Sequence, residues 1–161
     1  MKTAYITLGL PGCGKSTWAA ALPGHVARVE RDAIRATMAR EAAQEFTWAT
    51  WDFGREPEVQ RRWDAAIQAA VESGADLVVS DTNANTRFRR QLAQRLLTAE
   101  YDLVYVVFRV DEETCRARNA GRGSRSVQPE AYDKLRAGWS ETLAVLEEEA
   151  REFGARVIDV G

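Results

Sequence analysis

Histidine and cysteine are scarce in this sequence. Its 161 residues include a single histidine, His25, and two cysteines, Cys13 and Cys115, which lie far apart in the chain. Zinc sites and nucleophile–base pairs need such residues in close groups, so the sequence predicts no zinc site and no Cys–His or Ser–His catalytic pair. Chemistry in this protein must therefore rest on carboxylates, arginines and lysine.

The sequence also lacks an excess of positive charge. Its formal net charge is −2, whereas proteins that coat long nucleic acids neutralise many phosphates with basic side chains. Coating of a long nucleic acid is therefore excluded, although clustered arginines can still hold a few phosphates locally.

Long apolar runs are missing as well. No uncharged run approaches the ~20 residues that a membrane span needs, and the chain begins a strand pattern almost at once, without a charged and then apolar leader. The sequence therefore predicts a cytoplasmic protein that has no membrane partner.

No linker, internal repeat or low-complexity tract divides the chain. With 45% hydrophobic residues, residues 1–161 are expected to form a single domain that buries about 70% of its unfolded surface. Buried strands are predicted at 4–8, 26–30, 76–80, 103–110 and 156–160, with helical patterns between them. This alternation predicts an α/β fold with a mainly parallel sheet of about five strands and helices on both faces.

The stretch GLPGCGKSTW, residues 9–18, directly follows the first predicted strand. Its spacing matches the nucleotide-binding P-loop (Walker A motif), in which backbone N–H groups of a glycine-rich loop wrap a polyphosphate. Lys15 is expected to reach the β- and γ-phosphates and Ser16 to ligate Mg²⁺, at the start of a helix near Lys15. An ordinary glycine turn is the alternative. The predicted nucleotide-binding residues of this loop are Gly12, Cys13, Gly14, Lys15, Ser16 and Thr17.

Two further motifs follow the second and third predicted strands, where parallel sheets bind their ligands. In ERDAIR, Asp32 and Arg35 are expected on one face of a helix. The Asp32 carboxylate can then accept a proton while Arg35 holds a phosphate nearby. The alternative is that Asp32 caps the helix and forms an exposed ion pair with Arg35. In SDTNANTRFRR, Asp81 resembles the second carboxylate of P-loop enzymes, which holds Mg²⁺, or it caps the next helix. Thr82 and Asn83 are the next polar groups expected at the cleft.

Arginines gather in two more places. In CRARNAGRGSRSVQP, glycines on both sides of Arg122 predict a mobile lid over about 119–128, between a helix at 111–119 and another after residue 129; a solvated basic loop is the alternative. Arg118 and Arg125 are weaker candidates for the same role. The arginines at 87, 89 and 90 either meet substrate phosphates or solvate a helix, and the acidic run 147–149 is interpreted as a solvated helix face.

Taken in order, ITLGLPGCGKSTWA, ERDAIR, SDTNANTRFRR and RNAGRGSRSVQP resemble the kinase domain of the phage-type polynucleotide 5′-hydroxyl kinase family, over about residues 5–139. The resemblance implies a P-loop kinase fold and a transferase that moves the γ-phosphate of ATP or another nucleoside triphosphate to 5′-hydroxyl ends of DNA or RNA during repair. It also implies Mg²⁺ as cofactor, and the host cytoplasm as location if the protein is phage-encoded.

The same resemblance implies a role for each matched residue. Lys15, Asp32 and Arg122 would be catalytic: Lys15 holds the donor phosphates, Asp32 is the general base on the 5′-hydroxyl, and Arg122 clamps the transferring phosphate. On the acceptor side the implied residues are Arg35 for the acceptor's 3′-phosphate, Thr82 as its assistant, Asp81 for the metal or the lid, and Val127 facing the acceptor base.

The chain departs from the family in two respects. It shows no DxDGT motif of a phosphatase domain, so no phosphatase activity is expected. The segment 42–57, with Trp48, Trp51 and Phe53, has no match; core packing or a subunit contact is favoured over stacking on an acceptor base. Two other functions stay open: a P-loop kinase of a small molecule such as a sugar, nucleoside or antibiotic, and a non-catalytic nucleotide switch.

Overall fold

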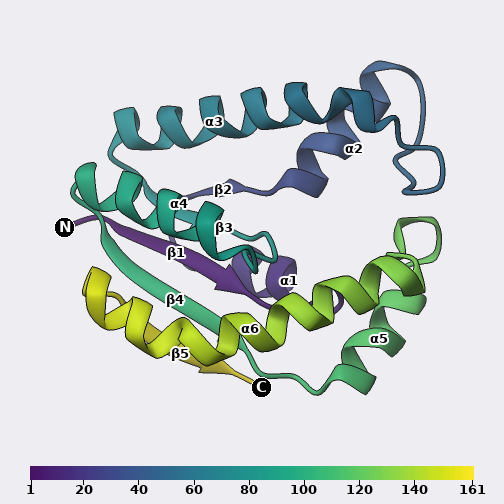
Figure 1. Cartoon of the computed structure of the whole chain (residues 1–161). Helices are drawn as coiled ribbons and strands as arrows, with labels where there is room; N and C mark the ends of the chain where they lie inside the picture. The colour runs from purple at the N-terminus through teal and green to yellow at the C-terminus, as the bar shows by residue number, and fades with distance from the viewer.

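The computed structural model describes all residues from 1 to 161 and contains one sheet of five parallel strands (Figure 1). The order across the sheet is β2-β3-β1-β4-β5, which confirms the predicted α/β class. The strands are β1 (Thr3–Leu8), β2 (Val26–Val29), β3 (Asp76–Val79), β4 (Asp102–Phe108) and β5 (Arg156–Val160). The helices are α1 (Lys15–Ala20), α2 (Arg31–Glu41), α3 (Glu56–Ser73), α4 (Thr86–Thr98), α5 (Glu112–Ala120) and α6 (Pro129–Phe153), with short 3-10 turns η1 (Phe53–Arg55) and η2 (Gly123–Arg125).

The central strands are buried on both faces, as near-continuous apolar sequences require. Along β4, Leu103, Tyr105 and Val107 pack against α3, α4 and α6, whereas Val104 and Val106 pack with Cys115 of α5 and with the P-loop. The alternation of side chains along a strand therefore gives each face of the sheet its own core, and α6 packs against both cores.

A buried ion pair fixes the loop that follows β3. Arg89 is 1% exposed and donates from Nε to Glu149 Oε2 at 2.7 Å, and its Nη1 donates to the carbonyl oxygens of Asn83 and Ala84. The guanidinium fork thus links α4, α6 and the loop after β3.

Two sequence interpretations were wrong at this ion pair. Arg89 is buried, so it neither meets a substrate phosphate nor solvates a helix, and Glu149 is 2% exposed, so the acidic run 147–149 is solvated only at 147 and 148. The pair also holds in place the loop that carries Asp81 and Thr82.

None of the helices combines the length and the apolar character that a membrane crossing requires.

Candidate active site

A cleft of about 1720 Å³ lies beyond the carboxyl ends of the strands. Figure 1 shows the two segments that flank it, the connection between α2 and α3 and the loop between α5 and α6, on the same side of the molecule. Twelve predicted site residues line this one cleft: Gly12, Cys13, Gly14, Lys15, Ser16, Thr17, Asp32, Arg35, Asp81, Thr82, Arg122 and Val127. The structure therefore brings together motifs that are more than a hundred residues apart in the sequence.

The P-loop connects β1 to α1 and is held from both sides. Gly12 has φ +86°, and a Cβ there would lie 2.4 Å from the carbonyl oxygen of Cys115, so only glycine fits against α5. The buried Lys15 Nζ donates to the carbonyl oxygens of Gly9 and Leu10, at 2.8 Å each. The Lys15 side chain therefore lies across the P-loop. Phosphate oxygens of a bound nucleotide can replace the two carbonyl oxygens as its hydrogen-bond acceptors.

A carboxylate that the sequence analysis missed lies against the P-loop serine. Ser16 Oγ donates to Glu30 Oε1 at 2.8 Å, and Ser80 Oγ donates to Glu30 Oε2 at 3.2 Å. Glu30 was expected as the last residue of the second strand, but β2 ends at Val29 and Glu30 begins the turn into α2. Its signal was its place directly after a strand, at the ligand-binding edge of the sheet.

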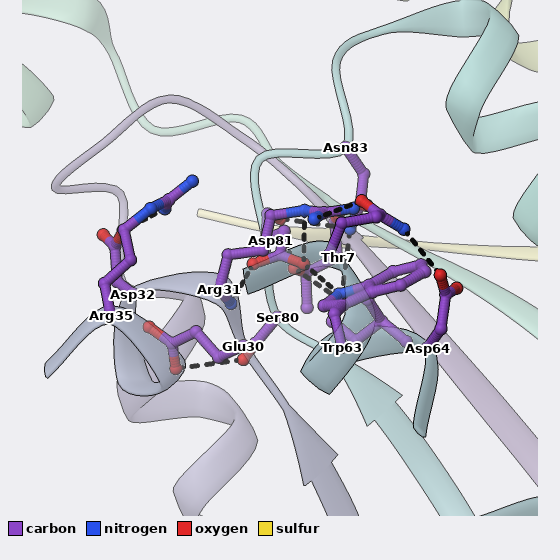
Figure 2. A network of polar contacts seen from close by, with 12 residues as sticks. Thr7, Glu30, Arg31, Asp32, Arg35, Trp63, Asp64, Ser80, Asp81 and Asn83 are labelled. Atoms are coloured by element: carbon purple, nitrogen blue, oxygen red, sulfur yellow. Dashed lines mark hydrogen bonds and ion pairs between the residues drawn. The ribbon is translucent and has the colours of Figure 1, made fainter. Parts of the chain in front are cut away.

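Both carboxylate oxygens of Asp81 accept hydrogen bonds from within the protein. Its Oδ1 accepts from the Arg31 backbone N–H at 2.8 Å and its Oδ2 accepts from Trp63 Nε1 at 2.9 Å, as Figure 2 shows. Burial raises the pKa of this carboxyl above its ordinary value, against the opposing effect of the Arg31 hydrogen bond. Asp81 thus anchors the first turn of α2 next to Asp32, and its role as a metal ligand stays a prediction.

Hard oxygen donors of the kind that Mg²⁺ prefers are present beside the P-loop. The hydroxyl of Ser16 and the carboxylate of Glu30 already touch, and Asp81 lies on the neighbouring strand end. The donor chemistry of these residues therefore fits Mg²⁺.

The expected general base is paired with two arginines from different elements. Asp32 Oδ1 accepts from Arg35 Nη1 at 2.7 Å, and its Oδ2 lies 3.9 Å from Arg122 Nη2. Arg35 is also bound by Glu56, whose two oxygens accept from Nε and Nη2 at 2.9 Å. The hydrogen bonds from Arg35 hold the pKa of Glu56 below its usual value. Arg35 is therefore fixed in place, and Asp32 keeps one oxygen directed toward Arg122.

Hydrogen bonds join the two ends of the predicted lid. The Asn119 side chain donates to the Val127 carbonyl and accepts from the Val127 N–H, both at 2.9 Å, and Ser126 Oγ donates to the Asn119 carbonyl. Residues 120–126 thus project as a short loop that carries Arg122 and Arg125. The predicted motion of this loop stays a prediction.

The cleft is strongly basic although the chain is not. Seven basic and three acidic side chains line it, so it suits an anion with several negative charges. The basic residues are Lys15, Arg31, Arg35, Arg118, Arg122, Arg125 and Lys134, and the acidic ones are Glu30, Asp32 and Asp81.

Asn83, which was expected to face the cleft, instead turns its amide into the fold, where it donates to the Thr7 carbonyl at 2.7 Å.

A family model described as an AAA domain matches residues 5–148, from β1 into α6. The chain belongs to the AAA domain family. Its match includes the P-loop, the α2 motif, the loop after β3 and the arginine loop, all of which line the cleft.

One viral protein is similar to this chain over most of its length. The protein named "Putative bifunctional polynucleotide kinase/RNA ligase" from Autographa californica nuclear polyhedrosis virus is 27% identical over 140 residues, which make up 83% of this chain and 20% of that protein. This AAA domain chain thus spans about a fifth of the length of that relative.

Two solved structures show the same fold at low identity. A chain in the structure of the Pnkp1/Rnl/Hen1 RNA repair complex matches with a TM-score of 0.72 and 21% identity, over 89% of this chain and 45% of that chain. Kti12 from Chaetomium thermophilum, in complex with ADP-AlF3, matches with a TM-score of 0.56 and 15% identity, over 84% of this chain and 79% of Kti12. The AAA domain of this chain has the P-loop kinase fold, as predicted.

Proposed function

We propose that this protein is a Mg²⁺-dependent polynucleotide 5′-hydroxyl kinase, which transfers the γ-phosphate of ATP or another nucleoside triphosphate to 5′-hydroxyl ends of DNA or RNA. The observation that carries the proposal is the meeting of Asp32 and Arg122 at 3.9 Å in a cleft that also holds a complete P-loop. A proton acceptor and a cation carried on a loop, both next to a phosphate-binding loop, are what transfer to a hydroxyl requires. The names of the viral relative and of the RNA repair complex support a nucleic-acid acceptor.

In the proposed reaction, the 5′-hydroxyl oxygen attacks the γ-phosphorus while the bond from that phosphorus to the β–γ bridging oxygen breaks. The hydroxyl proton passes to Asp32, and the nucleoside diphosphate leaves. Lys15 and Arg122 neutralise charge on the phosphoryl oxygens. When Mg²⁺ is bound, by Ser16 with Glu30 and Asp81 as the nearby carboxylates, it offsets the charge of the β- and γ-phosphates.

Arg35 keeps capacity for an acceptor phosphate although two carboxylates hold it. A guanidinium has five N–H groups, and three of them donate to Asp32 and Glu56, which leaves two. Its side chain is 12% exposed and lines the cleft. A role for Arg35 in binding the acceptor's 3′-phosphate is therefore compatible with its geometry and forms part of the proposal.

The function is tested by transfer of labelled γ-phosphate from ATP with Mg²⁺. Matched acceptors are 5′-hydroxyl DNA, 5′-hydroxyl RNA, a 3′-phosphorylated mononucleotide, and a panel of sugars and nucleosides. We expect label on the 5′ ends of the oligonucleotides, with a KM for them that rises with salt, because their phosphates are bound electrostatically. Label only on a sugar or nucleoside would replace the proposal by a small-molecule kinase, and label on no acceptor would favour a nucleotide switch.

The Mg²⁺ requirement should depend on Glu30. Replacement of Glu30 by glutamine is expected to raise the Mg²⁺ concentration for half-maximal rate by about 10- to 100-fold, because a carboxylate that contacts the ligating hydroxyl is lost. Binding of Mn²⁺ in the presence of a non-hydrolysable nucleotide, followed by electron paramagnetic resonance, should weaken in parallel.

Two further variants serve as controls for Glu30. Glu41→Gln removes an exposed carboxylate from the far end of α2, where Glu41 pairs with Arg62, and should leave the Mg²⁺ requirement unchanged. An unchanged requirement in Glu30→Gln, together with a raised one in Asp81→Asn, would assign the metal carboxylate to Asp81 instead.

A further inference from the structure

The connection between α2 and α3 carries two layers of aromatic side chains. The inner layer is core: Phe46 and Trp51 are 2% and 8% exposed and pack with Met38 and Val59, and Trp51 Nε1 donates to Glu56 Oε1 at 2.7 Å. Core packing or a subunit contact was the favoured interpretation of this segment, and Trp51 packs in the core.

The outer layer, Trp48 and Phe53, lines the active-site cleft. Their rings stack with centroids 6.1 Å apart and planes 24° from parallel. Trp48 also packs edge-on against Phe46, whereas Phe53 is 65% exposed. An exposed phenylalanine alone is ordinary. Here the exposed ring belongs to a stacked pair inside a cleft that otherwise binds anions.

This aromatic pair is connected directly to the expected catalytic carboxylate. The Arg35 guanidinium carbon lies 4.8 Å from the centre of the Trp48 ring, and the same guanidinium donates to Asp32 at 2.7 Å. A hydroxyl that loses its proton to Asp32 therefore brings the rest of its molecule next to these rings. Nucleobases have planar faces that stack on aromatic side chains, and such stacking is tolerant of sequence.

We propose that Phe53, whose ring is stacked on Trp48, also stacks on the 5′-terminal base of the acceptor. The proposal rests on the polynucleotide kinase function above and adds to it a base-recognition surface. Arg35 positions the nucleotide through its phosphate and Phe53 holds its base, so the 5′-hydroxyl is oriented toward Asp32 from two sides. Trp48 is a positioning residue, because its contacts to Phe46, Arg35 and Phe53 already surround its ring.

The test compares two acceptors that differ only at the 5′-terminal nucleotide, one with a base and one abasic. Phe53→Ala is expected to raise the KM for the normal acceptor by about 5- to 150-fold, the range that the loss of one stacked base gives. The KM for the abasic acceptor and the KM for ATP should stay within about twofold. Phe53→Tyr should restore the normal KM, because it restores an aromatic face.

Matched variants separate stacking from structural damage. Phe88 is 64% exposed on the first turn of α4 and does not line the cleft, so Phe88→Ala should behave as wild type. Trp48 Nε1 has no hydrogen-bond partner, so Trp48→Phe removes no hydrogen bond and should retain tight acceptor binding. Trp48→Ala should reproduce the effect of Phe53→Ala.

The possible failures are distinguishable. Equal KM values of Phe53→Ala and wild type for the normal acceptor would overturn the stacking proposal while leaving the kinase function intact. A rise of the same size for the normal and the abasic acceptor would also overturn it, because the loss would then be structural. A wild-type protein that phosphorylates no oligonucleotide would overturn the function itself, and the stacking proposal with it.

Discussion

Replacement of Asp32 by asparagine is expected to lower the rate of phosphoryl transfer by about 10²- to 10⁴-fold, the usual contribution of a positioned general base. Asparagine has nearly the same shape, and its Oδ1 can still accept the 2.7 Å hydrogen bond from Arg35. The first turn of α2 should also persist, because Asp81 holds it through the Arg31 backbone N–H. The variant therefore loses the proton acceptor and little else.

The rate is measured in single turnovers with labelled ATP and a saturating 5′-hydroxyl oligonucleotide, so that product release does not mask the chemical step. The dissociation constant for ATP should change by less than about threefold, because Asp32 lies in α2 and not in the P-loop. Asp102→Asn is the matched control. Asp102 is exposed at the start of β4, at the opposite edge of the sheet from the cleft. A near-normal rate in Asp32→Asn would refute the general-base role.

Local sequence patterns were enough to predict the frame of this site. The strand runs, the glycine spacing of the P-loop and the polar residues directly after each strand all reflect interactions between near neighbours in the chain. Because parallel strands bring their carboxyl ends to one edge, the predicted side chains had to meet there. The structure places all of them except Asn83 in the same cleft.

Contacts between distant residues could not be predicted in this way. Arg89 and Glu149 are 60 positions apart, and nothing near either residue shows that they form a buried pair. Asp81 was similarly ambiguous, because the sequence does not show that the Trp63 indole and the Arg31 N–H use both of its oxygens. A single sequence shows the type of each polar group but not its long-range partner.

The aromatic connection shows a second limit. Trp48, Trp51 and Phe53 look alike in composition and lie within six residues, yet Trp51 is core and Phe53 is exposed in the cleft. What separates them is the position of α2 and α3, which cover one layer and leave the other open. Tertiary packing therefore buries Trp51 and leaves Phe53 exposed, a difference that the sequence alone does not show.

Replacement of Arg122 by alanine is expected to lower the rate by about 10³- to 10⁵-fold, the effect of removing an arginine that neutralises charge on a transferring phosphoryl group. Its side chain is 34% exposed and forms no hydrogen bond within the protein, and its nearest charged partner is Asp32 at 3.9 Å. An arginine that is held so weakly is free to bind a phosphate. We expect the loss mainly in kcat, measured with both substrates saturating, because the charge develops in the transition state.

Arg125 is the matched control, because it lies in the same loop and lines the same cleft but is not paired with Asp32. Arg125→Ala should cost far less than Arg122→Ala. Equal losses would mean that the loop contributes only its overall charge. Since Asp32 and Arg122 act on the same transfer step from opposite walls, the double variant should be little slower than the slower single variant. Independent, multiplicative losses would instead mean that the two residues contribute to the transfer without energetic coupling.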